Sequence, residues 1–103
     1  MGRTTPPLPL PVQRALRKLG ADLRDARVRR RIKTEVMADR LQVSRPTLRR
    51  LERGDAGVGM GTYATALYVL GLVDRLAALA DLAHDHVGQQ LASDALPRRI
   101  VDP

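Results

Sequence analysis

Arginine side chains are concentrated in a ten-residue segment, residues 44–53, with the sequence SRPTLRRLER. Four of these residues are arginines and only Glu52 is acidic. A guanidinium group can bond to both major-groove acceptors of guanine, and each good pair gives about 1 to 3 kcal/mol of base discrimination. The hydroxyls of Ser44 and Thr47 suit a base edge or a phosphate. The segment therefore has the chemistry of a DNA-reading surface, although a solvated charged helix would have the same composition.

Apolar spacing predicts that this segment is a helix with one buried face. Leu48 and Leu51 are three residues apart and would supply its inner contacts. Ser44 is the candidate N-cap, but Pro46 disfavours helical angles at the residue before it, so Arg45 is the alternative cap. The positions expected to face outward are polar or cationic: Ser44, Arg45, Thr47, Arg49, Arg50 and Arg53.

A second short helix is predicted just before this segment, from about Thr34 to Leu41, with Thr34 or Lys33 at its cap. Residues 42–43 leave room only for a tight turn between the two helices. Two short helices joined in this way form a helix-turn-helix unit, whose second helix can lie in the DNA major groove. The inner face of the first of these helices would carry Met37, Ala38 and Leu41.

Three more helices are expected around this unit, which makes the predicted fold all-α with five helices. The first runs from Val12 to about Arg31, the fourth from about Met60 to Leu70 and the fifth from Val73 to about His84. Gly54 is expected to end the third helix in a left-handed conformation, before a glycine-rich loop at 55–61. The residues expected to face inward on the first and fourth helices are Val12, Leu16, Leu19, Leu23, Ala26, Met60, Tyr63, Ala64, Leu67 and Leu70.

The ends of the chain differ from this central part. Four prolines lie among residues 1–11, which favours an extended, flexible N-terminal arm. Helical periodicity weakens beyond Val87. We therefore predict a helix-turn-helix DNA-binding domain at 12–86 and a C-terminal tail at 87–103.

Charge divides the chain into two unlike halves. Residues 1–54 hold fifteen Lys and Arg against five Asp and Glu, for a net charge of +10, whereas residues 55–103 hold three against six, for −3. A strongly positive end suits a polyanion and an acidic end suits another partner. Arginine-rich helices are common in proteins encoded by high-GC genomes, and this would be a simpler explanation of the same imbalance.

Several kinds of chemistry have no support in the sequence. The chain has no cysteine, so disulfides and thiolate metal sites are excluded. His84 and His86 would point to different sides of a helix, which favours surface residues over metal ligands. The glycine-rich loop lacks the Lys-Ser/Thr ending of a phosphate-binding loop. With no apolar leader or membrane span in view, we expect a cytoplasmic protein that is not an enzyme and needs no cofactor, metal or catalytic residue.

The run from Ile32 to Gly54, IKTEVMADRLQVSRPTLRRLERG, resembles the helix-turn-helix of the Cro/Xre repressor family. The resemblance rests on Ala38 in the middle of the second helix, Val-Ser at the turn (43–44) and the closing Glu-Arg-Gly (52–54), and it covers about residues 16–71. It implies a phage-repressor-like fold and a sequence-specific DNA-binding transcriptional repressor.

The same resemblance assigns roles to individual positions. The family usually has a glutamine against a phosphate at position 34, where this chain has Thr34 after Lys33, and phosphate contact by both is expected. An internal ion pair of the family would join Arg27 to Glu52, which makes Arg27 an architectural residue. The base-reading positions fall on Arg45, Pro46, Thr47 and Arg50, with Ser44 and Arg49 adjacent.

A narrower resemblance follows. Residues 53–72, RGDAGVGMGTYATALYVLGL, and their continuation at 78–100 are similar to HipB-type antitoxins, which are repressors encoded beside a HipA-type kinase toxin. This implies an autoregulating homodimer on a near-palindromic, double-stranded DNA operator, with half-sites about 34 Å apart. The leucine-rich helix at 72–83 is the leading dimer surface, and packing within the monomer is the alternative use of its leucines.

Three functions follow as competing hypotheses. The first is the specific repressor, either as an antitoxin or as a stand-alone phage-type repressor. The second is an interaction protein that holds a toxin kinase inactive, with a tail from Ala92 to Pro103 that orders on its partner. The third is sequence-independent nucleic-acid binding driven by the positive half alone.

Overall fold

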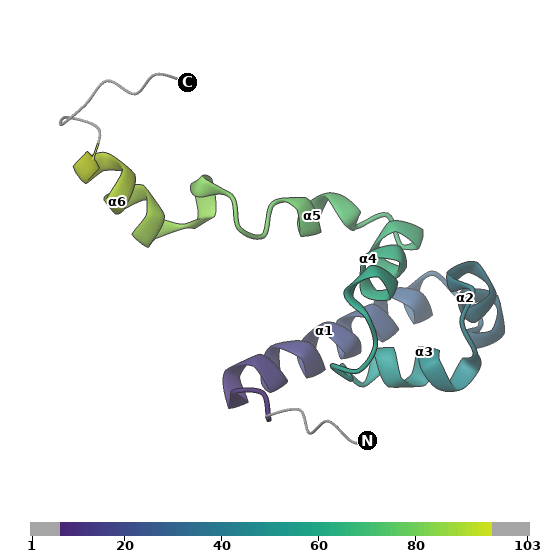
Figure 1. Cartoon of the computed structure of the whole chain (residues 1–103). Coiled ribbons are helices and arrows are strands. Elements are labelled where there is room, and N and C mark those ends of the chain that lie inside the picture. The colour runs from purple at the N-terminus through teal and green to yellow at the C-terminus, as the bar shows by residue number, and fades with distance from the viewer. Residues whose placement is uncertain (1–6, 96–103) are drawn as a thin grey trace.

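The computed structural model describes residues 7–95 of the chain, and this part confirms the predicted all-α fold (Figure 1). It holds no strand, and six α-helices where five were expected. The elements in chain order are α1 (Leu10–Arg29), α2 (Thr34–Leu41), α3 (Arg45–Glu52), α4 (Met60–Val69), α5 (Val73–Ala77), the short 3-10 helix η1 (Leu82–His84) and α6 (His86–Ala95).

The hydrophobic core lies where the first four helices meet. α3 packs against both α1 and α2, and α4 packs against α2. Leu48 and Leu51, the predicted inner residues of α3, are 0% and 1% exposed. The buried apolar residues are Leu23, Ala26, Met37, Ala38, Leu41, Leu48, Leu51, Val58, Tyr63, Ala66 and Leu70.

The first helix begins at Leu10, two residues before the predicted start at Val12. Leu10 and Pro11, expected in the extended arm, are therefore helical. Pro11 fits there because it lies in the first turn of α1, where the N–H that proline lacks has no partner within the helix. Val12 is 41% exposed rather than inward. The N-terminal end of α1 extends past the core (Figure 1), so its apolar stripe is buried only further along the helix. Residues 1–6 of the predicted arm lie outside the described residues.

Close backbone contact fixes the crossing of α1 and α3. A Cβ atom at Gly20 would lie 2.5 Å from the amide nitrogen of Gly54 and 2.7 Å from the carbonyl oxygen of Leu51. Gly54 has the predicted positive φ, 75°, although α3 itself ends two residues earlier at Glu52. The two glycines therefore let the backbone beyond α3 rest directly on α1.

The fourth helix matches its predicted range to within one residue, but one of its expected core residues is wrong. Met60 is 72% exposed, because it occupies the first turn and projects past the core. The buried side of α4 is formed instead by Tyr63 and Ala66, with Leu70 at the C-cap.

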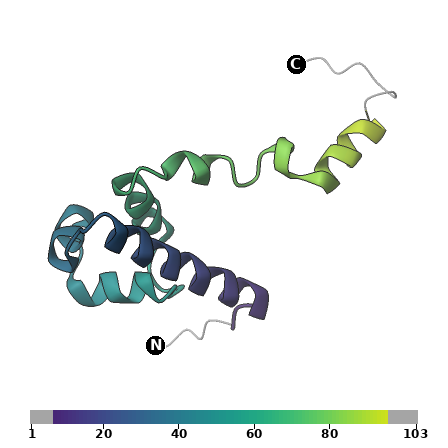
Figure 2. The same cartoon turned by 180° about the vertical axis from the view of Figure 1, so that it is seen from behind.

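The largest difference lies after Gly71. The predicted fifth helix from Val73 to His84 is wrong: α5 ends at Ala77, and η1 and α6 follow as separate short elements. A helix is stable in water mainly when one of its faces packs against other elements. The chain after α5 has few such neighbours, since α6 packs mainly on η1 (Figures 1 and 2). The radius of gyration, 18.1 Å, exceeds the roughly 13 Å of a compact 100-residue domain.

No helix in residues 7–95 is long and apolar enough to cross a membrane.

Candidate nucleic-acid interface

The helix-turn-helix unit forms where the sequence predicts it. Gln42 ends α2 in the left-handed conformation with φ 56°, which turns the chain sharply toward α3. Ser44 is the N-cap of α3, since its Oγ accepts a hydrogen bond of 3.2 Å from the backbone N–H of Thr47. The same hydroxyl donates to Oγ1 of Thr47 at 3.0 Å. The alternative cap, Arg45, is the first residue inside the helix.

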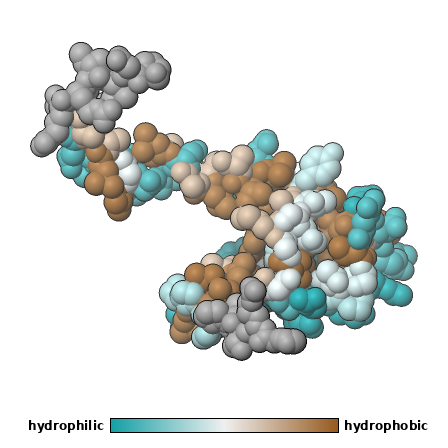
Figure 3. All heavy atoms as spheres, in the orientation of Figure 1, coloured by the Kyte–Doolittle hydropathy of each residue, from teal (hydrophilic) through white to brown (hydrophobic). Residues whose placement is uncertain are grey.

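The outward face of α3 is cationic, as predicted. Arg45, Pro46, Arg49 and Arg53 are exposed. Within residues 7–95, Arg45, Arg49 and Arg53 form no ion pair, so their guanidinium groups are available to an external anion. Figure 3 shows hydrophilic side chains over α2 and α3, in contrast to the hydrophobic surface over α5.

Arg50 differs from the other arginines because the following loop holds it. Its Nε donates to Oδ2 of Asp55 at 2.9 Å, and both side chains are about two-fifths exposed, at 42% and 40%. Asp55 is fixed in turn, because its Oδ1 accepts from the N–H of Gly57 at 2.7 Å and its backbone carbonyl accepts from the Tyr63 hydroxyl at 2.8 Å. The Arg50 guanidinium is therefore positioned by an anchored carboxylate.

The hydrogen-bonded pair of Arg50 and Asp55 stabilises the ionised forms of both side chains. The hydrogen bond from Arg50, followed by the one from Gly57, lowers the pKa of Asp55 below its ordinary value. The same pairing raises the pKa of Arg50. Burial, together with the nearby Asp55 charge, raises the pKa of Tyr63, so its hydroxyl stays protonated as a donor.

A second ion pair holds α3 against α1, and it confirms the pair that the family resemblance implies. Arg27 donates from Nε and Nη2 to the two carboxylate oxygens of Glu52, at 2.7 and 3.1 Å. The side chains are only 10% and 9% exposed. Arg27 also donates from Nη1 to the carbonyl of Ile32 at 2.9 Å, just before α2. Arg27 thus ties three segments together and faces away from solvent.

The remaining predicted site residues lie at the start of α2. Lys33 is the exposed N-cap of α2, and Thr34 is its half-buried first residue. Neither side chain caps the helix, so the N–H groups of its first turn stay available to an acceptor such as a phosphate. The structure gathers Ser44, Arg45, Pro46 and Thr47 in the first turn of α3, with Arg49 and Arg50 one turn further on.

Sequence reasoning missed the residues that position Arg50. The glycine-rich sequence indicates only a loop at Asp55, although an aspartate two residues before a glycine is typical of a turn in which the carboxylate accepts a backbone N–H. Gly57 belongs to the same feature, because a Cβ atom there would lie 2.7 Å from Nη2 of Arg50. His84 and His86 lie at the surface as expected, with Nδ1 of His84 2.7 Å from a carboxylate oxygen of Asp81.

Comparison with protein families gives one match, a helix-turn-helix domain family whose model covers residues 18–84. This range includes α2, the turn and α3, and it runs through η1. No curated protein and no solved structure matches the chain.

Proposed function

Because the chain belongs to the helix-turn-helix domain family, a DNA-binding family, we propose that it is a sequence-specific transcriptional repressor and not an enzyme. The observation that carries the proposal is α3: a capped helix held by two buried leucines, with a row of exposed arginines on its outer side. A helix of this kind presents donors to base edges without needing to rearrange.

Each site residue has a distinct role in this proposal. Arg45 and Arg50 read guanines, and Thr47 contacts a base edge or thymine methyl group. Pro46 keeps the first turn rigid without losing a hydrogen bond, since the N–H at that position has no partner within the helix. Ser44 and Arg49 make adjacent contacts, and Lys33 and Thr34 bind phosphates at the start of α2.

The biological setting is the finer part of the proposal. The similarity of residues 53–72 to HipB-type antitoxins supports an autoregulating antitoxin in the cytoplasm, which acts as a homodimer on a near-palindromic operator and binds a HipA-type kinase toxin. Such a dimer would read two half-sites about 34 Å apart on one side of the duplex.

The first experiment compares binding to the gene's own upstream region with binding to a scrambled fragment, at about 150 mM salt. A preference of roughly 10³ or more is expected of base readout. Arg45→Ala should abolish preference at one base position, whereas Arg24→Ala, on an exposed part of α1, should leave it unchanged. Equal, weak binding that disappears as salt rises would instead indicate charge-driven binding without sequence recognition.

A protein-interaction role is the second candidate, and the exposed apolar residues after α5 favour it. Leu82, Val87 and Leu91 are 56%, 71% and 64% exposed. If this role dominates, deleting residues 92–103 should release a toxin while operator binding persists. Loss of specific DNA binding on the same deletion would contradict the separation of the two roles.

A further inference from the structure

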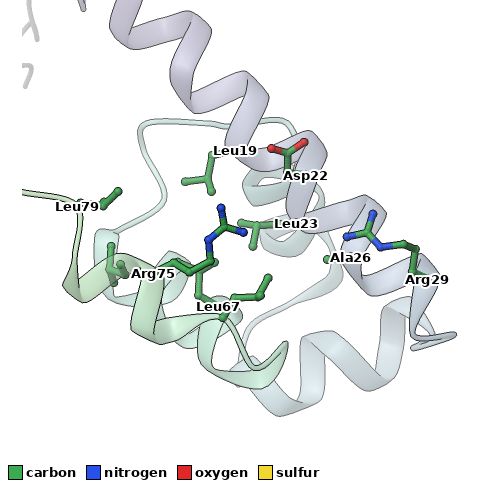
Figure 4. A pocket seen from close by; sticks show the side chains of 10 residues that line it. Leu19, Asp22, Leu23, Ala26, Arg29, Leu67, Arg75 and Leu79 are labelled. Atoms are coloured by element: carbon green, nitrogen blue, oxygen red, sulfur yellow. The ribbon is translucent and has the colours of Figure 1, made fainter. Parts of the chain in front are cut away.

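An apolar groove lies between α1 and α5 (Figure 4). Its volume is about 360 Å³. A groove of this size could accept several apolar side chains from a neighbouring helix, and removing them from water would favour the contact. Its leucine lining consists of Leu19, Leu23, Leu67, Leu72, Leu76 and Leu79.

The groove also carries positive charge that residues 7–95 do not neutralise. Arg29 and Arg75 both line it, and Figure 4 shows the guanidinium of Arg75 pointing from α5 into the groove toward α1. Neither arginine forms an ion pair within this part of the chain. The acidic lining residue, Asp22, is already paired with Lys18. The occupant that fits is therefore apolar and acidic.

The segment from residue 81 to residue 95, here named the C-terminal arm, has that chemistry. It contains three aspartates, Asp81, Asp85 and Asp94, and no lysine or arginine. On α6, Val87 and Leu91 are four residues apart and so lie on one face of the helix. Both are more than three-fifths exposed, at 71% and 64%.

Within the arm, α6 lies apart from the groove of its own chain, whereas His84 of η1 lines a hollow beside the groove residues Arg75 and Leu79. Gln89 donates from Nε2 to the carbonyls of Leu82 and Ala83, at 2.7 and 3.1 Å, which holds α6 against η1. Figures 1 and 2 both show α6 apart from α1 and α4. The apolar face of α6 and the groove are thus both uncovered within one chain.

We propose that the groove receives α6 of a second copy of this chain, so that two copies exchange their C-terminal arms reciprocally. This deepens the homodimer of the proposed function and rests on it. Charge selects this pairing, since arm against arm would oppose three aspartates to three, and groove against groove would oppose arginine to arginine. Arm against groove joins opposite charges twice, in the self-complementary arrangement that a two-fold dimer requires.

The test uses two substitutions at exposed positions, measured by sedimentation of the full chain without DNA. Leu91→Lys places a cation opposite Arg75, and Arg75→Glu places an anion opposite the acidic arm. We expect the wild-type chain to be dimeric and each variant to raise the dimer dissociation constant at least tenfold. Ser93→Lys, on the opposite face of α6, is the matched control and should stay dimeric.

Mixing the two variants distinguishes exchange from other dimers. The wild-type arm of the Arg75→Glu chain fits the wild-type groove of the Leu91→Lys chain, and the second contact pairs Lys with Glu, so the mixture should form heterodimers. An arm-to-arm dimer would tolerate Arg75→Glu, and an arm folded onto its own groove would leave the wild-type chain monomeric. Either result, or a mixture that stays monomeric, overturns the proposal. Operator binding is measured separately, so a monomer that still prefers its operator would remove the homodimer but leave the proposed sequence-specific DNA binding standing.

Discussion

Arg50 is the outward arginine of α3 whose direction the protein itself sets. With Nε bonded to Asp55, its Nη1 and Nη2 donate to no other group in residues 7–95 and stay available. Two parallel N–H donors are what the O6 and N7 acceptors of guanine require. Asp55 therefore acts as a positioning residue for base recognition, in the proposed function.

Replacing Asp55 by Asn tests this role directly. The amide keeps the size of the side chain but loses the charge that holds Arg50, so preference at the base read by Arg50 should fall about tenfold, within the 1 to 3 kcal/mol of one base contact. Non-specific affinity should not fall, because a negative charge has been removed near the phosphates. Competition binding with single-base operator variants measures both. Asp74→Asn, at an exposed position on α5, serves as the control.

The same carboxylate should make stability depend on acid pH. Its pKa is lower in the folded chain than its ordinary value of 3.8. The stabilisation is therefore fully present above pH 3.8 and is lost as the pH falls through the lower folded pKa. Denaturant unfolding between pH 5 and 2, on the wild type and on Asp55→Asn, should show a smaller loss of stability in the variant. Parallel pH profiles would contradict the pairing.

The buried pair of Arg27 and Glu52 should matter more to folding than any surface pair. Glu52→Gln leaves a guanidinium that is 10% exposed without its counter-charge, which should cost about 3 kcal/mol of unfolding free energy. Asp22→Asn breaks the exposed pair with Lys18 and should cost under about 0.5 kcal/mol. Equal losses in urea unfolding would show that the buried pair is not a structural clamp.

At the scale of elements, the position of α3 depends on a glycine contact as well as on its buried leucines and the pair of Arg27 and Glu52. Gly20 lies against the backbone of residues 51–54. Three backbone atoms there are between 2.5 and 2.8 Å from the position that a Cβ atom on Gly20 would occupy. These atoms belong to the end of α3 and the turn that follows, so they cannot move aside as a flexible side chain could.

Gly20→Ala should therefore push α3 away from α1. We expect a loss of about 1 to 3 kcal/mol, as for overpacking of a core, together with weaker DNA binding by the folded protein. Gly61→Ala is the control, since a Cβ there meets nothing within 4 Å and alanine favours a helix. Thermal unfolding should show the two variants shifting in opposite directions, and a neutral Gly20→Ala would show that the contact can relax.

At the scale of the whole molecule, positive and negative charge lie in different parts of the chain. The basic half contains the helix-turn-helix unit, and the acidic half contains the C-terminal arm. The basic half attracts a polyanion and the acidic arm repels one, so a polyanion is directed to the basic half of the chain.

Salt dependence should reveal how much of the binding comes from phosphate contacts. The logarithm of the binding constant is expected to fall linearly with the logarithm of salt concentration, with a slope of about −0.9 for each phosphate neutralised. Lys33→Ala should reduce this slope by about 1 and weaken all sequences alike, whereas Arg45→Ala should change the sequence preference as well. A Lys33→Ala chain with an unchanged slope would remove Lys33 from the phosphate contacts.

The sequence by itself determined the helix-turn-helix unit. The bounds of α2, the inner leucines of α3 and the left-handed Gly54 follow from patterns within a few residues, because helical periodicity is local. The sequence left Ser44 and Arg45 as alternative caps of α3, and the structure has Ser44. The family resemblance supplied the pair of Arg27 and Glu52. The base-reading and phosphate-binding roles remain predictions.

Only the tertiary structure decided which surfaces meet. Met60 and Val12 fit an apolar pattern but lie beyond the edge of the core, and the predicted fifth helix ends where the chain leaves the body. The hold of Asp55 on Arg50, the contact of Gly20 with Gly54 and the groove beside the C-terminal arm likewise depend on how distant segments pack. A local pattern shows that a side chain can be buried, but burial itself needs a neighbouring element, and its position is a property of the whole fold.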